Sequence, residues 1–96
     1  MKLKLTKQSK RDLDEIWDYI AQDNPDAADG FIESVYEKCC LIAERPKIGR
    51  ERHELVAGIR SFPVGNYLIF YHLQDKAVII DRILSGYRDL PSFFSP

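Results

Sequence analysis

The 96-residue sequence lacks most features of disulfide-stabilised, metal-binding and cofactor-binding proteins. Its two cysteines, Cys39 and Cys40, are adjacent. Neighbouring side chains on a helix point about 100° apart, so this pair predicts neither an ordinary disulfide nor two ligands of one metal ion. We interpret both as partly buried small apolar residues. No nucleotide, flavin or metal motif is present, and we expect no cofactor.

Long apolar runs are also absent. No stretch reaches the roughly 18 continuous apolar residues of a membrane-spanning helix. The first five residues, Met1 to Leu5, include two lysines and are too polar for the core of a signal peptide. We therefore expect a cytoplasmic protein that does not bind a membrane.

The sequence has no overall charge excess. It contains 14 Lys and Arg and 15 Asp and Glu, for a net charge of −1, which does not predict strong binding to free nucleic acid. The stretch from Arg45 to Arg60 differs, because its five basic and two acidic residues leave a local excess of three positive charges. That stretch is either a local phosphate contact or a solvated loop of mixed charge.

Apolar and aromatic residues are plentiful in comparison. Hydrophobic residues make up 45% of the chain, with 5 Phe, 5 Tyr and 1 Trp. A chain of this length buries roughly two-thirds of its unfolded surface, which is enough for one core. We predict a single domain over residues 1–96.

The N-terminal half predicts a short strand followed by a helical hairpin. Lys2 to Leu5 alternate polar and apolar as in a half-buried strand. Apolar residues at helical spacing then predict one helix over residues 7–22, capped by Thr6, and a second from Pro25 to Arg45, capped by Asn24 and stopped by a proline. Gly30 interrupts the second helix and indicates close approach to the first.

The C-terminal half predicts three strands. They are expected at Ile59–Val64, Tyr67–Leu73 and Ala77–Leu84. Gly65-Asn66 suits a tight turn with positive φ, and Pro63, which lacks a donor, places its strand at a sheet edge. Residues 46–57 are predicted to be a loop with a helical turn near Glu54-Leu55. The tail after Gly86 is too short for an independent helix and is expected to pack as an extension.

The predicted order β-α-α-β-β-β defines an α+β domain, with an antiparallel helical hairpin on one face of a small antiparallel meander. An ordered set of residues in this framework resembles the ParE branch of the ParE/RelE toxin superfamily, from type II toxin-antitoxin systems. The set comprises Asp12-Leu13, Ile16, Tyr19-Ile20, Asn24-Pro25, Ala27-Ala28, Phe31, Pro46, Gly49-Arg50, Glu54-Leu55, Gly58-Ile59-Arg60, Tyr67 to Tyr71, and Arg82 to Asp89. The family's fold agrees with the predicted one.

The resemblance implies one of two activities. ParE-like toxins are associated with direct inhibition of DNA gyrase, whereas RelE-like toxins cut messenger RNA in the ribosome. The ribonuclease alternative requires a general base, a general acid and cationic groups on one face, and the candidates are Arg60, His72, Arg82 and Tyr87. A third alternative is a non-toxic remnant that only binds its antitoxin.

We favour the non-enzymatic reading because the charge balance does not suit a ribosomal RNA surface and no acid/base pair is evident. On this reading His53 and His72 are solvated or capping residues. Arg82 pairs with Asp81 or a helix carboxylate, and the Tyr71 ring is packed with its hydroxyl at the rim.

The resemblance also implies a ParD-like antitoxin that wraps the domain, and a gyrase target. Apolar residues of the helical hairpin are candidates for the antitoxin contact: Trp17, Tyr36 and Ile42. Candidates for the target contact lie on the sheet and tail: Arg60, Arg82, Tyr87, Arg88, Phe93 and Phe94. The two phenylalanines either plug the domain's own core or anchor a partner.

Overall fold

The computed structural model describes residues 1–94 and confirms the predicted α+β class. The helices are α1 (Lys7–Ala21), α2 (Pro25–Glu44) and α3 (Pro91–Phe94), and the strands are β1 (Lys2–Leu5), β2 (Arg50–Glu51), β3 (Arg60–Val64), β4 (Tyr67–Gln74) and β5 (Ala77–Ser85). The two-residue β2 was not predicted, because it lies in a charged stretch with no apolar alternation. No helix within residues 1–94 is long and apolar enough to cross a membrane.

The sheet is mixed rather than purely antiparallel. Its order is β1-β5-β4-β3-β2, and the predicted meander of β3, β4 and β5 is antiparallel. β1 joins at the far side and runs parallel to β5, with Leu3 opposite Val78. Parallel pairing is possible because the whole helical hairpin lies in the connection after β1.

The prediction that Pro63 marks an edge strand is wrong for the first half of β3. β2 pairs with β3 through Arg50 opposite Ser61 and Glu51 opposite Arg60, so β2 forms the edge there. Pro63 lies beyond this short ladder, and its missing N–H therefore interrupts no β2 hydrogen bond.

Side-chain caps begin both long helices as predicted. Thr6 Oγ1 accepts a hydrogen bond from the Ser9 N–H at 3.1 Å, and Asn24 Oδ1 accepts one from the Ala27 N–H at 3.1 Å. The prediction for Gly30 is wrong, because a Cβ built there meets nothing within 4 Å. Gly30 therefore costs helix propensity, about 1 kcal/mol against alanine, with no packing reason among the described residues.

Both hairpin turns use positive φ, and of the predicted pair Gly65-Asn66 only the glycine does so. Gly65 has φ of 57° as expected, whereas Asn66 does not. In the β4–β5 turn, Asp75 and Lys76 have φ of 50° and 61°. A two-residue hairpin with both central residues at positive φ matches the strand twist, and Asp tolerates this region better than most residues.

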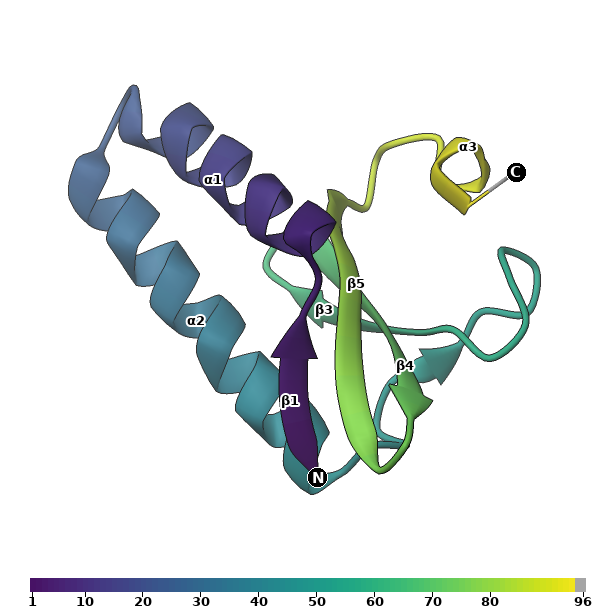
Figure 1. The fold of residues 1–96 in the computed structure, drawn as a ribbon. Coiled ribbons are helices and arrows are strands. Elements are labelled where there is room, and N and C mark those ends of the chain that lie inside the picture. The colour runs from purple at the N-terminus through teal and green to yellow at the C-terminus, as the bar shows by residue number, and fades with distance from the viewer. Residues whose placement is uncertain (95–96) are drawn as a thin grey trace.

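The sheet is covered on both faces (Figure 1). α1 and α2 lie side by side on one face and form the larger core, whose fully buried members include Val35, Cys39, Ile42, Ile69, Tyr71, Val78 and Ile80. α3 lies on the other side, over a smaller cluster formed by Leu55, Ile59, Leu68, Phe70, Leu84, Leu90, Phe93 and Phe94. Strand β4 is apolar on consecutive residues because it contributes to both clusters.

The two cysteines differ in environment, so the prediction that both are partly buried is wrong. Cys39 is fully buried in the larger core, and Cys40 is exposed. Burial raises the pKa of the Cys39 thiol to about 12, with a smaller contribution from Cys40. Cys39 therefore stays protonated and acts as a small apolar side chain.

Candidate partner-binding sites

The four residues proposed for ribonuclease chemistry do not meet on one face. Arg60 lies opposite Tyr71 in the β3–β4 ladder, and Arg82 lies opposite Phe70 in the β4–β5 ladder. Directly opposite residues share a face, and Tyr71 and Phe70 belong to the two different core clusters. The two arginines therefore start from opposite faces of the sheet and form no common phosphate cradle.

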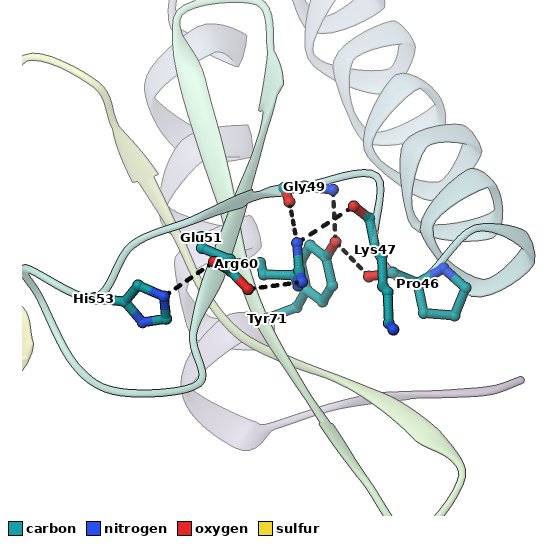
Figure 2. A network of polar contacts seen from close by, with 7 residues as sticks. All are labelled: Pro46, Lys47, Gly49, Glu51, His53, Arg60 and Tyr71. Atoms are coloured by element: carbon teal, nitrogen blue, oxygen red, sulfur yellow. Dashed lines mark hydrogen bonds and ion pairs between the residues drawn. The ribbon is translucent and has the colours of Figure 1, made fainter.

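The Tyr71 hydroxyl ties the loop after α2 to the sheet (Figure 2). It donates to the Pro46 carbonyl at 2.8 Å and accepts from the Gly49 N–H at 2.8 Å. The prediction that this hydroxyl lies at the rim is therefore wrong, and burial raises its pKa. Gly49 is required because a Cβ there would lie 2.5 Å from the hydroxyl oxygen.

Arg60 reinforces the same loop. Its guanidinium donates to the Gly49 carbonyl at 2.7 Å and the Lys47 carbonyl at 3.3 Å, and it pairs with Glu51 at 3.1 Å (Figure 2). Glu51 also contacts the exposed His53 ring at 3.0 Å. This network accounts for Arg60 as a loop-positioning residue. His53 is largely exposed, as predicted, and also pairs with Glu51.

Arg82 is bound to a helix carboxylate, which confirms one of the two predicted pairings. Its Nε and one terminal nitrogen each donate to Asp12 of α1 at 2.9 Å, and the Ile83 N–H donates to the same carboxylate at 2.9 Å. Only 4% of the Asp12 side chain is exposed. Hydrogen bonding to Asp12 raises the pKa of Arg82, despite partial burial. The sequence placed Asp12 in the set of residues that resembles the family, but only the fold shows that it is the partner of Arg82.

His72 is paired rather than simply solvated or capping. Its Nδ1 lies 2.6 Å from Asp81 Oδ2, and its Nε2 lies 3.2 Å from Gln74 Oε1. Burial lowers the pKa of His72, but the hydrogen bonds to Asp81 and Gln74 outweigh it and raise the pKa overall. His72 and Arg82 line a cavity of about 440 Å³ whose lining includes neither Arg60 nor Tyr87.

The C-terminal tail carries two exposed residues, Tyr87 and Arg88, and two packed phenylalanines. Tyr87 is 86% exposed, the largest exposure among the exposed large hydrophobic residues. Phe93 lies near two guanidinium groups, with the Arg82 carbon 5.1 Å and the Arg88 carbon 5.6 Å from its ring centre. Phe94 packs on Phe70 at 4.9 Å between ring centres. Both phenylalanines therefore pack on the domain's own smaller cluster.

The helical hairpin carries a second surface. Trp17 is 36% exposed, with its indole N–H donating to Asp29 at 2.8 Å, and Tyr36 is 46% exposed. Both line a surface groove of about 670 Å³ between α1 and α2. Ile42 is fully buried in the larger core, so it has no surface to offer a partner and leaves the candidate set.

The structure commits the proposed charged residues of the sheet to contacts within the domain. The charged candidates on the sheet are held by carboxylates or loop carbonyls, and no acid/base pair faces a cavity shared by all four proposed residues. Within residues 1–94, no group of three or more His, Cys, Asp or Glu side chains is placed to hold a metal ion.

Comparison with known proteins identifies the family to which this chain belongs. The family model described as ParE toxin of type II toxin-antitoxin system, parDE, matches residues 3–90. The chain therefore belongs to the ParE toxin family.

Individual relatives agree with this assignment. The chain is 32% identical over 89 residues to Toxin ParE3 of Caulobacter vibrioides, a match that covers 88% of this chain and 86% of the relative. It is 32% identical over 82 residues to Toxin ParE1 of the same organism, with 84% of each chain covered. A solved structure described as the chromosomal ParDE TA system from P. aeruginosa superposes with a TM-score of 0.76 at 25% identity, covering 88% of this chain and 95% of that one.

Proposed function

We propose that this ParE toxin acts by binding DNA gyrase, at its A subunit, and trapping it on cleaved DNA, without catalytic chemistry of its own. The observation that carries the proposal is the placement of Arg60 and Arg82 on opposite faces of the sheet, each committed to structural contacts. A ribonuclease of this fold needs cationic and acid/base groups to converge on one phosphate. A binding inhibitor has no such requirement.

The target contact is best supported at the exposed part of the tail. Tyr87 and Arg88 are exposed, whereas Arg82, Phe93 and Phe94 are partly buried, and the Phe93 ring lies beside both guanidinium groups. Arg60 is partly buried at the loop after α2 and takes no part in this surface. Exposed Tyr and Arg side chains are typical hot spots of protein interfaces. We assign the gyrase contact to Tyr87 and Arg88.

Substitution of Tyr87 tests this assignment. The Tyr87→Ala variant should raise the toxin concentration that half-inhibits gyrase supercoiling by about tenfold or more, as expected for loss of a hot-spot aromatic. Tyr36→Ala, an exposed aromatic on the helical hairpin, is the matched control and should leave this concentration unchanged. A point variant is preferable to tail deletion, because removing Leu90 and Phe94 would uncover Phe70. Equal inhibition by wild type and Tyr87→Ala contradicts the assigned contact.

The mode of action has its own test. Expression of the chain without antitoxin should arrest growth, and the purified protein should inhibit supercoiling. Primer extension on translated messenger RNA should show no toxin-dependent cuts. Codon-linked cuts with intact supercoiling would establish the ribonuclease alternative, and normal growth at verified expression would establish a non-toxic remnant.

The proposal includes a ParD-like antitoxin as the neutralising partner. The match to a solved ParDE complex supports a paired antitoxin, and the chain's own hairpin leaves Trp17 and Tyr36 exposed beside a groove. A reading frame next to the toxin gene, with a DNA-binding N-terminus, would be the expected source. Co-purification of its product with this chain, and rescue of growth by it, test the pairing.

A further inference from the structure

The sheet face that carries α3 is covered over only part of its length. α3 packs against the cluster that contains Phe70 and Leu84, whereas the β4–β5 turn lies at the opposite end of the sheet (Figure 1). Near this turn, strands β1, β5 and β4 form two rows across the sheet: Lys2–Ala77–Gln74 and Lys4–Ile79–His72.

Both rows point to the same face as α3. Lys2 and Lys4 alternate along β1 with Leu3 and Leu5, which pack against the larger core on the other face. His72 lines a cavity together with α3. The exposed and partly exposed members of the two rows form what we call the open half of this face: Lys2, Lys4, His72, Gln74 and Ile79.

The cations of this face are unpaired at both of its edges. Lys2 and Lys4 are exposed on the edge strand β1 and form no ion pair within residues 1–94. Arg50 of the opposite edge strand, β2, is also exposed and forms no ion pair in this range. Arg50 lies opposite Ser61, which in turn lies opposite Phe70, so its side chain starts from the same face.

Most nearby carboxylates are already neutralised by other residues. Asp81 lies 2.6 Å from the His72 ring, and Glu54 is bound by Arg52 at 2.9 Å. The β4–β5 turn adds one exposed group of each sign, Asp75 and Lys76. The positive charge of the two edges therefore has no internal partner to compensate it.

The wider distribution of charge has the same polarity. Residues 7–44 contain 10 Asp and Glu against 4 Lys and Arg, a net charge of −6. The rest of the chain contains 10 Lys and Arg against 5 Asp and Glu, a net charge of +5. A polyanion is therefore attracted to the sheet side and repelled by the helical side.

The residue types favour phosphates over an acidic protein surface. Lysine is depleted in protein interfaces but is a common point-charge contact for phosphate. The cations lie on the two outermost of five strands, so they span four strand spacings, about 19 Å. Duplex DNA presents one negative charge per about 1.7 Å of its axis, which supplies phosphates over the whole of this width.

We propose that Lys2, Lys4 and Arg50 bind the phosphate backbone of the DNA that gyrase holds, an inference that rests on the proposed binding to gyrase. The assigned gyrase contact includes Arg88, which lies against Phe93 of α3 at the covered end of the same face. One side of the toxin thus meets both gyrase and its DNA. The contact is independent of base sequence, because phosphates carry none. It adds to affinity mainly after the toxin has docked, because docking raises the local concentration of DNA.

Charge reversal on β1 tests the proposal with the full chain, fluorescently labelled at the exposed Cys40. Anisotropy should show that wild type binds gyrase holding a linear duplex about tenfold more tightly than gyrase alone. The Lys2→Glu/Lys4→Glu variant should lose this advantage and bind gyrase alone as wild type does. Its salt slope on the gyrase–DNA complex should fall by about 2, one for each lost phosphate contact. The matched control is Lys10→Glu/Lys38→Glu, which makes the same charge change on the helical layer and should keep the advantage.

Two further variants make the test independent of strand stability. Lys2→Gln/Lys4→Gln removes the charges without placing carboxylates on β1, and it should lower the salt slope by the same amount. Arg50→Glu removes a contact at the other edge, and its slope should fall by about 1. Circular dichroism of each variant establishes that the fold is retained before binding is compared.

The outcomes separate this inference from the function on which it rests. If wild type binds gyrase equally with and without DNA, the DNA contact is wrong while gyrase binding stands. If the β1 variant is equally weakened toward gyrase alone, these lysines meet protein instead of DNA. If both double variants lose the advantage equally, only net charge matters. If wild type binds neither gyrase nor the gyrase–DNA complex, the proposed function fails and this inference fails with it.

Discussion

The helical layer and the rest of the molecule carry opposite charge. Residues 7–44 have a net charge of −6, while the remaining residues, with 10 Lys and Arg against 5 Asp and Glu, have +5. The overall value of −1 conceals this separation. Net charge governs long-range behaviour, but a partner at contact distance meets one layer at a time, because fields from exposed charges are screened within about 10 Å. The two layers therefore suit partners of opposite charge.

The two layers also differ in how their charged groups are used. On the sheet side Arg52, Arg60 and Arg82 each bind a carboxylate and hold loops or α1 in place. On the helical side Glu33 and Glu37 are exposed and unpaired within residues 1–94. These three arginines of the sheet side thus serve the architecture, whereas Glu33 and Glu37 of the helical side remain available for binding.

The connection between the layers depends most on Asp12, and its removal should have the largest effect. Asp12→Ala leaves the Arg82 guanidinium and the Ile83 N–H without their buried acceptor. Loss of one partner of a buried ion pair costs about 3–5 kcal/mol. Urea unfolding should show this loss, whereas the exposed Asp14→Ala on the same helix should change stability by at most about 0.5 kcal/mol. Similar midpoints for the two variants would show that the ion pair does not join the layers.

A smaller effect is expected at the loop between the layers. Tyr71→Phe removes the hydroxyl that bonds Pro46 and Gly49. The two unpaired backbone groups should cost about 1–3 kcal/mol, and amide exchange at Gly49 should accelerate. Tyr67→Phe is the control, because the Tyr67 hydroxyl makes no hydrogen bond within residues 1–94. Unchanged exchange at Gly49 would contradict the assigned clamp.

The smallest effect is expected at His72, within the sheet layer. Its folded pKa is raised above 6.5, so protonation stabilises the fold fully below pH 6.5, and this contribution is lost as pH rises through the raised pKa. Asp81→Asn should lower the His72 pKa measured by NMR. The stability difference from wild type, under about 1 kcal/mol for this partly exposed pair, should be largest below pH 6.5. An unchanged His72 pKa would show that Asp81 does not set it.

Prediction from the sequence worked best where local chemistry decides. The caps at Thr6 and Asn24 and the apolar spacing of both helices were correct, because each depends on residues within one or two turns. It failed at Gly30, where a propensity argument was extended to a contact between helices. It also failed for Ile42, which was proposed to contact the antitoxin but is fully buried. A helical period identifies the apolar residues of a helix, but it does not show which of them stay accessible to a partner.

The sequence by itself determined the order of the elements other than the short β2 and α3, the α+β class and the membership of the ParE family, since these depend on periodicity, turn chemistry and an ordered set of residues. Only the tertiary structure decided that Arg60 and Arg82 lie on opposite faces, that Asp12 binds Arg82 across 70 residues of sequence, and that Glu33 and Glu37 border an apolar groove. The physical reason is that side-chain pairing across strands and helices depends on register and layer packing, which no local pattern encodes.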